Sequence, residues 1–444
     1  MMKLTKILSL SMAAVLATSG LAACSSDSSD AAGDGAGQVY FLNWKPEQDA
    51  AYQKIAEEYT AKTGVPVKVV TAASGTYEQT LKSQISKSDA PTLIQVNGPV
   101  GLASWQKYTE NLTDTDFAKA LNDPELALKG EDGNVYGVPL AVEGYGLIYN
   151  QEIFDKYFAL PGAKASSMDE IDGFQKLKEV ADDMQAKKDE LGIDGVFAST
   201  SLATGEDWRW QTHLSNVPFY YEFKDNNDMD PAEVEFKYND EFKNLFDLYL
   251  TDSTIPASLA PSKDVASSMA EFALGKAAMV QNGTWAWSQI SEIDGNTVAE
   301  ENIKFMPLYT GHNGEDKQGL CIGTEAFMAI NAKASEADKQ ATIDFVNWLF
   351  LSDEGKEHVV NDLGFIAPFT NYTEADVPND PLAKQMAESM TNGNTNVVPW
   401  IFTVYPGQAF KNAFGQALGQ YAAGNMEWSE VVDTVKENWA AEKK

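Results

Sequence analysis

The alternation of apolar and polar positions predicts a regular succession of strands and helices from residue 38 onward. Residues 39–44 read as a strand, and residues 46–62 then repeat apolar side chains at the spacing of one helix face. Gly64 is placed to end that helix. The pattern continues as strand, helix and strand over residues 65–70, 76–86 and 92–96. This order is typical of a mainly parallel α/β sheet covered by helices.

The remainder of the chain predicts further elements of both kinds. We expect helices over residues 171–188, 241–251, 265–274, 335–351 and 428–443. We expect strands over residues 277–281, 303–308 and 320–330, with Asn282-Gly283 as a turn after the first of them. Residues 134–150 form a long extended stretch in which Gly144 and Gly146 permit a bend or a crossing between domains.

Length and composition indicate two globular domains. A chain of 444 residues is too long for one compact core. Hydrophobic residues make up 44% and charged residues 22%, which is ordinary for a soluble globular protein. Beyond the N-terminus no stretch approaches 18 uninterrupted apolar residues, so we expect no second membrane segment.

The N-terminus has the pattern of a targeting segment. Lys3 and Lys6 precede an apolar run over residues 7–17 that is too short to span a bilayer, and Leu21-Ala-Ala-Cys24 follows. This resembles a bacterial lipoprotein signal, which implies cleavage before Cys24 and a lipid on its sulfur. We therefore expect residues 1–23 to be a signal peptide and residues 24–37 a flexible tether. An ordinary secretory signal with a chance cysteine is the alternative. A lipid anchor on the outer face of the cytoplasmic membrane favours a Gram-positive bacterium.

The charge balance excludes several classes of partner. Asp and Glu number 65 against 33 Lys and Arg, giving a formal charge of −32, which repels nucleic acid and anionic headgroups. Cys321 is the one cysteine besides Cys24, so an internal disulfide or a cysteine zinc site is excluded in the mature chain. Residues 225–230 have a calcium-loop composition, but Met229 and Pro231 stand where an EF-hand needs a ligand and a glycine. We expect no metal and no cofactor, and we expect Cys321 to be a buried small apolar residue.

Neutral sugars fit the remaining chemistry. Ten tryptophans contribute to an aromatic content of 11%. The apolar face of a sugar ring stacks on a flat aromatic side chain, and its hydroxyls bind carboxylates and amides. Ligands of α/β sheets lie beyond the carboxyl ends of the strands, where Trp44, Lys45 and Asn97 are expected.

Four stretches resemble the extracellular solute-binding proteins of sugar-importing ABC transporters, the family that includes maltodextrin-binding protein. They occur in the same order as in that family, at residues 39–70, 139–150, 275–287 and 351–355. The closest match is Gly275-Lys-Ala-Ala-Met279 followed by Asn282-Gly-Thr-Trp285-Ala-Trp287. The segments at residues 200–239 and 394–408 match poorly, which implies a ligand different from linear maltodextrin.

The resemblance implies a two-lobe fold like that of periplasmic binding proteins, with a multi-strand hinge and a ligand cleft between the lobes. One lobe would hold residues 38–146 and 308–350, and the other residues 147–307 and 351–444. The protein would be a monomer that closes over a neutral oligosaccharide and delivers it to the permease subunits of an ABC importer.

The resemblance also implies ligand-binding residues. Trp285 matches an aromatic residue that stacks on sugar, and Glu143 matches a carboxylate that binds hydroxyls near the hinge. The other candidates lie in segments that face the ligand in the family: Trp44, Lys45, Glu47, Asn97, Trp208, Trp210, Asn282, Trp400 and Tyr405. Core packing is the alternative for each aromatic residue, and turn chemistry alone would explain Asn282.

Two other functions remain open at this point. A surface glycoside hydrolase would use two carboxyl groups across the scissile bond, and sequence spacing cannot exclude such a pair. Against an enzyme, the three histidines are scattered, and HExxH, GxSxG and GxxxxGK[ST] motifs are absent. A solute-binding protein for a peptide or another small molecule is the second alternative. We expect a receptor and not an enzyme.

Overall fold

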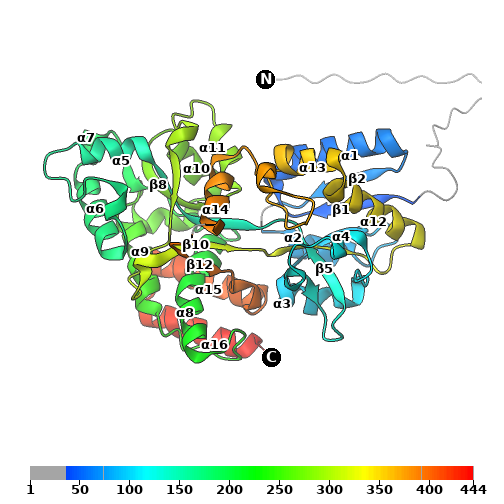
Figure 1. Cartoon of the computed structure of the whole chain (residues 1–444). Helices are drawn as coiled ribbons and strands as arrows, with labels where there is room; N and C mark the ends of the chain where they lie inside the picture. The colour runs from blue at the N-terminus through cyan, green and yellow to red at the C-terminus, as the bar shows by residue number, and fades with distance from the viewer. Residues whose placement is uncertain (1–36, 74, 392, 444) are drawn as a thin grey trace, which may run out of the picture.

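The structure is a computed structural model that describes residues 37–73, 75–391 and 393–443. The expected signal peptide, the lipidated Cys24 and nearly all of the tether lie outside the described residues. The described chain forms two lobes side by side, each built around its own sheet (Figure 1). No helix of the described part is long and apolar enough to cross a membrane.

The first lobe contains a sheet with strand order β2-β1-β3-β11-β5-β4. Its strands are β1 (Val39–Asn43), β2 (Val67–Thr71), β3 (Leu93–Asn97), β4 (Leu128–Lys129), β5 (Val135–Pro139) and β11 (Ala326–Ile330). Strand β1 pairs in parallel with β2 and β3, as the sequence predicts, whereas β11 runs antiparallel to β3. The candidate loops at the carboxyl ends of β1 and β3 therefore open on the same edge of the sheet.

Helices cover both faces of this sheet. They are α1 (Asp49–Thr63), α2 (Tyr77–Gln84), α3 (Gly98–Trp105), α4 (Asp116–Lys119), α12 (Glu336–Leu351) and α13 (Asp353–Glu357). The predicted apolar face of α1 is confirmed, since Tyr52, Ile55, Ala56 and Tyr59 are buried. Gly64 ends the helix with a φ of 76°, a conformation that glycine adopts without strain.

The second lobe contains a sheet with strand order β12-β10-β6-β8-β7, and β9 also pairs with β6. Its strands are β6 (Glu143–Asn150), β7 (Gly195–Phe197), β8 (Ala277–Gly283), β9 (Ile303–Met306), β10 (Gln318–Gly323) and β12 (Asn396–Pro399). The predicted Asn282-Gly283 turn is wrong. Both residues continue β8, because they pair with Gly146 and Tyr145 of β6.

Ten helices are described around the second sheet. They are α5 (Gln151–Phe158), α6 (Phe174–Ala186), α7 (Lys188–Leu191), α8 (Ser215–Asn226), α9 (Asn239–Thr251), α10 (Val265–Ala273), α11 (Ala286–Ser291), α14 (Pro381–Thr391), α15 (Gln408–Ala422) and α16 (Trp428–Glu442). Aromatic side chains fill much of the space beneath them; Phe219, for example, stacks on Phe236 and contacts Trp439. A π-helical turn over Arg209–Leu214 leads into α8.

Within the described residues the chain crosses between the lobes three times. The crossings are residues 140–142 between β5 and β6, residues 324–325 between β10 and β11, and residues 377–380 before α14 (Figure 1). The first two lie close together, because the Leu140 main-chain N–H donates to the carbonyl oxygen of Ala326, the residue that follows the second crossing. The two-lobe α/β fold that the resemblance implies is therefore present.

Some expected boundaries require correction. Residues 320–330 do not form one strand, because Thr324 and Glu325 separate β10 from β11, which pair in different sheets. Strand β10, expected in the first lobe, belongs to the second for this reason. Conversely, residues 353–372, expected in the second lobe, pack their apolar side chains, among them Val359 and Phe369, on the first-lobe core. Cys321 in β10 is buried, as expected.

Candidate ligand-binding site between the lobes

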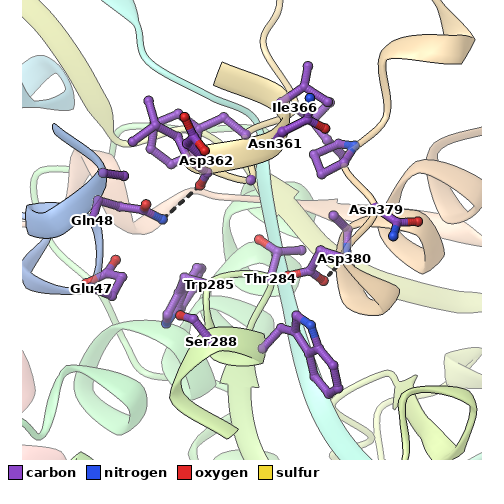
Figure 2. A pocket seen from close by; sticks show the side chains of 18 of the residues that line it. Glu47, Gln48, Thr284, Trp285, Ser288, Asn361, Asp362, Ile366, Asn379 and Asp380 are labelled. Carbon is purple, nitrogen blue, oxygen red and sulfur yellow. Dashed lines mark hydrogen bonds between the residues drawn. The ribbon is translucent and has the colours of Figure 1, made fainter. Parts of the chain in front are cut away.

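A cavity of about 490 Å³ lies between the two lobes. Its first-lobe wall comes from the segment between β1 and α1 and from residues 360–366, and its second-lobe wall comes from α11 and from the start of α14. Figure 2 shows Glu47 and Gln48 on one side of this space, with Trp285 and Ser288 opposite them. The cavity is therefore formed by both lobes together.

Three of the predicted ligand-binding residues line this cavity: Glu47, Glu143 and Trp285. Lys45 lies next to them, although it does not line the cavity itself. Its Nζ donates to Glu143 Oε1 at 2.7 Å, lies 3.9 Å from Glu47 Oε1 and lies 5.6 Å from the centre of the Trp285 ring. The structure thus brings together residues that are as many as 240 positions apart in the sequence, from Lys45 to Trp285.

The charges at this place act strongly on one another: one lysine lies beside two carboxylates. Burial alone would lower the pKa of Lys45, but Glu143 and Glu47 outweigh burial, and the pKa is raised. Burial raises the pKa of Glu47, although Lys45 opposes that shift. Lys45 is therefore held in its charged form at neutral pH. We call Lys45, Glu47 and Glu143 the charged side of the cleft.

The second lobe contributes an aromatic surface beside the cavity. The Trp285 ring lies 6.0 Å from that of Trp208 and 6.5 Å from that of Trp400. The His213 ring lies among the three tryptophans and stacks on Tyr145 at 3.9 Å. Of these side chains and Arg209, only Trp285 lines the cavity itself, and the others lie behind it. We call Trp208, Arg209, His213, Trp285 and Trp400 the aromatic side of the cleft.

Several polar atoms of the aromatic side are buried without a hydrogen-bond partner among the described residues. They are Arg209 Nε and Nη1, His213 Nδ1 and Trp400 Nε1. Burial lowers the pKa of His213 well below its usual value, and Arg209 adds to this effect, so the imidazole is neutral. Flat rings next to free donors are the two features that a sugar ring with hydroxyl groups requires.

Other predicted residues lie away from the cavity. The Trp44 ring packs edge-on against Tyr77, and its main-chain N–H donates to Gln95 Oε1. Asn282 is buried in β8, where its Oδ1 accepts from the Gly283 N–H and from Arg209. Asn282 thus orients Arg209 in this structure and does not face the cavity.

Two predicted aromatic residues belong to the second-lobe core. Trp210 is 1% exposed and packs between Phe246 and Tyr249. Tyr405 is equally buried, and its hydroxyl lies 3.1 Å from Ser215 Oγ. Tyr405 is also among the residues that line the second cavity described below, and ligand contact at Trp210 and Tyr405 stays a prediction.

A second cavity of about 640 Å³ separates the lobes where α2 and α3 face α15. Asn97, Trp105 and Lys411 are among its lining residues. Near this cavity the lobes touch, since a Cβ on Gly98 would stand 2.9 Å from Thr403 Cβ. The lobes also meet where Gly75 faces Gly205. The two lobes therefore contact each other directly at two places beyond the segments that connect them.

The ligand-binding residues predicted from the sequence do not include Arg209 or the residues of the cavity wall near Asp362 and Asp380. A signal for Arg209 exists in the sequence, because it is the one arginine among 33 basic residues. Asp362 and Asp380 carry no comparable signal, since they face the cavity only because residues 353–372 stay on the first lobe and residues 377–380 then cross to the second. No cluster of His, Cys, Asp and Glu suited to a metal occurs in the described part of the chain.

Comparison with known proteins identifies similar chains. A family model described as bacterial extracellular solute-binding protein matches residues 54–385. A melibiose/raffinose/stachyose-binding protein of Bacillus subtilis (strain 168) is 33% identical over 87 residues, which cover 19% of this chain. The match spans only 20% of the length of that curated relative.

Solved structures share the fold over nearly the whole chain. A chitin oligosaccharide binding protein has a TM-score of 0.70 at 16% identity, with 91% of this chain and 98% of that chain covered. The raffinose complex of the solute-binding protein RafE has a TM-score of 0.69 at 17% identity, with 92% and 100% covered. A sugar transporter protein from Bacillus licheniformis in complex with stachyose has a TM-score of 0.67 at 18% identity, with 91% and 99% covered.

Proposed function

Because this chain belongs to the bacterial extracellular solute-binding proteins, we propose that it binds a neutral oligosaccharide between its lobes and delivers it to an ABC importer. The observation that carries the proposal is the cavity in which Trp285 of one lobe faces Glu47 of the other, beside further tryptophans. Relatives described as raffinose-, stachyose- and chitin oligosaccharide-binding proteins support this class of ligand.

The proposed mechanism is closure of the two lobes around the sugar. A sugar ring that stacks on Trp285 and donates a hydroxyl hydrogen to Glu47 contacts both walls at once, and Glu143 of the second lobe offers a further acceptor. Such a ligand stabilises the closed arrangement by the contacts that it makes there and not in the open one. The closed form is then what the permease subunits receive.

The location of the protein belongs to the same proposal. We infer that Cys24 carries a lipid, that residues 24–37 act as a tether and that the monomer works on the outer face of the cytoplasmic membrane of a Gram-positive bacterium. Holding a receptor near its permease raises its local concentration there. Labelling with a radioactive fatty acid, in the wild type and in Cys24→Ser, tests the anchor.

Calorimetry with mass analysis of the recovered ligand tests the function. The chain without residues 1–24 is titrated with raffinose, stachyose, chitin oligosaccharides and xylan-derived oligosaccharides. One-to-one binding with the sugar returned intact supports the receptor. Shortened products would instead support the surface glycoside hydrolase, and binding of peptides alone would support a non-sugar receptor.

A further inference from the structure

Arg209 is exceptional in this chain. It is the one arginine among 33 basic residues, and it is 2% exposed, in the π-helical turn Arg209–Leu214. Lysine supplies every other permanent positive charge of the described lobes, mostly on the surface. A π-helical turn inserts one extra residue per turn and often occurs at functional sites. Both facts indicate that this position needs the guanidinium group itself.

The guanidinium group is held in place but is not satisfied. Its central carbon lies 3.9 Å from the centre of the Trp208 ring, and its Nη2 donates to Asn282 Oδ1 at 3.3 Å. Its Nε and Nη1 have no hydrogen-bond partner among the described residues. Arg209 also forms no ion pair, since no carboxylate oxygen among the described residues lies within 4.0 Å of its guanidinium nitrogens.

A buried charge in this condition is costly. Burial lowers the pKa of Arg209 to about 10, so the group stays charged at neutral pH. An unpaired buried ion destabilises a protein unless hydrogen-bond acceptors surround it. The acceptors for Nε–H and Nη1 must therefore come from something other than the described residues.

We propose that Arg209 is a specificity-determining ligand residue, which donates hydrogen bonds from Nε and Nη1 to neighbouring hydroxyl oxygens of a neutral sugar unit. This inference rests on the proposed function and assigns one of its contacts. Trp208 and Asn282 are positioning residues, because one holds the plane of the guanidinium group and the other holds its Nη2. A lysine could not replace Arg209, because its single ammonium group cannot donate from two fixed positions.

The surrounding charges favour a neutral sugar over an acidic one. Glu206 and Glu47 both act electrostatically on Arg209. A sugar carboxylate at Arg209 would therefore lie near two further carboxylates, which would repel it. Hydroxyl oxygens accept the same hydrogen bonds without that repulsion.

Calorimetry of variants provides the first test, with the neutral sugars named above and with trigalacturonate as the acidic comparison. Arg209→Lys keeps the charge but loses the fixed donors, and we expect it to weaken sugar binding about tenfold or more. The control is Lys178→Gln, which removes one positive charge from an exposed ion pair with Asp182 in the same lobe and should change affinity less than about twofold. Melting curves establish that each variant is folded.

The presence of one arginine permits a second test that does not depend on a folded variant. Protein labelled with [15N]arginine gives a single Nε–H signal in a nitrogen–proton NMR spectrum, and that signal is Arg209. We expect saturating sugar to shift it and to slow its exchange with water, whereas a sugar that does not bind leaves it unchanged.

The outcomes separate this inference from the proposed function. If wild-type protein binds a neutral sugar but the NMR signal does not move and Arg209→Lys binds equally well, Arg209 is not a ligand residue and the receptor function stands. Tighter binding of trigalacturonate than of every neutral sugar would overturn the choice of a neutral unit. If no sugar binds the wild-type protein, the proposed function fails, and this inference fails with it.

Discussion

The two sides of the cleft solve the problem of buried polar groups in opposite ways. On the charged side, Lys45 donates a hydrogen bond of 2.7 Å to Glu143 and lies 3.9 Å from Glu47. On the aromatic side, Arg209, His213 and Trp400 keep nitrogen atoms without partners among the described residues. Lys45 and Glu143 therefore have each other as partners without a ligand, whereas these nitrogen atoms have no partner among the described residues.

This difference indicates where a ligand gains its binding energy. A sugar that approaches the charged side exchanges existing hydrogen bonds for new ones, so its net gain there is small. At the aromatic side it covers flat rings and supplies acceptors that the protein lacks. We therefore expect affinity to depend chiefly on the aromatic side and stability chiefly on the charged side.

The largest expected effect is that of Trp285→Ala. Loss of a stacking ring from a closed cleft should weaken sugar binding by at least about 3 kcal/mol, a factor above about one hundred. Calorimetry with the best-bound sugar measures it. Trp428→Phe, which alters a ring between Phe242 and Tyr421, is the control and should leave affinity unchanged. Equal affinities of Trp285→Ala and wild type would contradict the expectation that affinity depends chiefly on the aromatic side.

Glu143→Gln should affect stability more than affinity. It removes the closest partner of Lys45 and leaves Glu47 as the remaining carboxylate at 3.9 Å, so we expect a loss of about 2 kcal/mol in the free energy of unfolding. Urea denaturation measures this loss. Lys45→Met in the same chain should recover only part of it, because the lysine charge is then gone but Glu47 has lost its cation. A larger change in affinity than in stability would show that Glu143 acts mainly on the ligand.

Asp207, beside Trp208, should make stability depend on pH. Burial, with a contribution from Glu206, raises the pKa of Asp207 from 3.8 to about 6. The folded state therefore binds this proton more tightly than the unfolded chain does. The stabilisation from this group is complete below pH 4 and is lost as pH rises from about 4 to about 6.

Asp207→Asn should remove the loss of stability that Asp207 causes as the pH rises. The shift corresponds to about 3 kcal/mol at most, and we expect the variant to be more stable than wild type by about 2 kcal/mol at pH 8 and equal to it near pH 4. Urea denaturation at both pH values tests this, with the exposed Asp294→Asn as control. A difference that does not change with pH would contradict the explanation.

The smallest effect is expected at the contact between the lobes. Gly98 has a φ of 56°, and Gly98→Ala adds a Cβ close to Thr403, so closure should become harder and apparent affinity should fall by about 1 kcal/mol. Small-angle scattering with and without sugar reports closure directly. Thr403→Gly should relieve the collision in the double variant but not the strain of a positive φ at an alanine. An unchanged closed fraction in Gly98→Ala would show that this contact does not limit closure.

The first lobe was the more predictable part of the molecule. Its α1 face, the stop at Gly64 and the parallel pairing of β1 follow from apolar spacing and local backbone preferences, which act within a few residues. The break between β10 and β11 was missed because both strands are apolar, and only pairing with distant strands assigns them to different sheets. Local pattern cannot show that choice.

The candidate site was predictable in part. Motif position placed Trp285, Glu143 and Glu47 at one cavity, but it could not separate Trp208 from Trp210, which stand two residues apart. A π-helical turn begins at Arg209, and it directs Trp210 to the core while Trp208 faces Trp285. Spacing rules for strands and α-helices do not describe such a turn.

The glycine contacts between the lobes have a consequence for how this receptor can diversify. Where Gly75 meets Gly205 and Gly98 meets Thr403, closure depends on backbone atoms and very short side chains. The residues that would distinguish one sugar from another, such as Trp208 and Arg209, are different ones. Substitutions near Trp208 and Arg209 can therefore accumulate without altering how the two lobes contact each other. In this way one fold can change its ligand specificity during evolution while it keeps the surface shape that its transporter contacts.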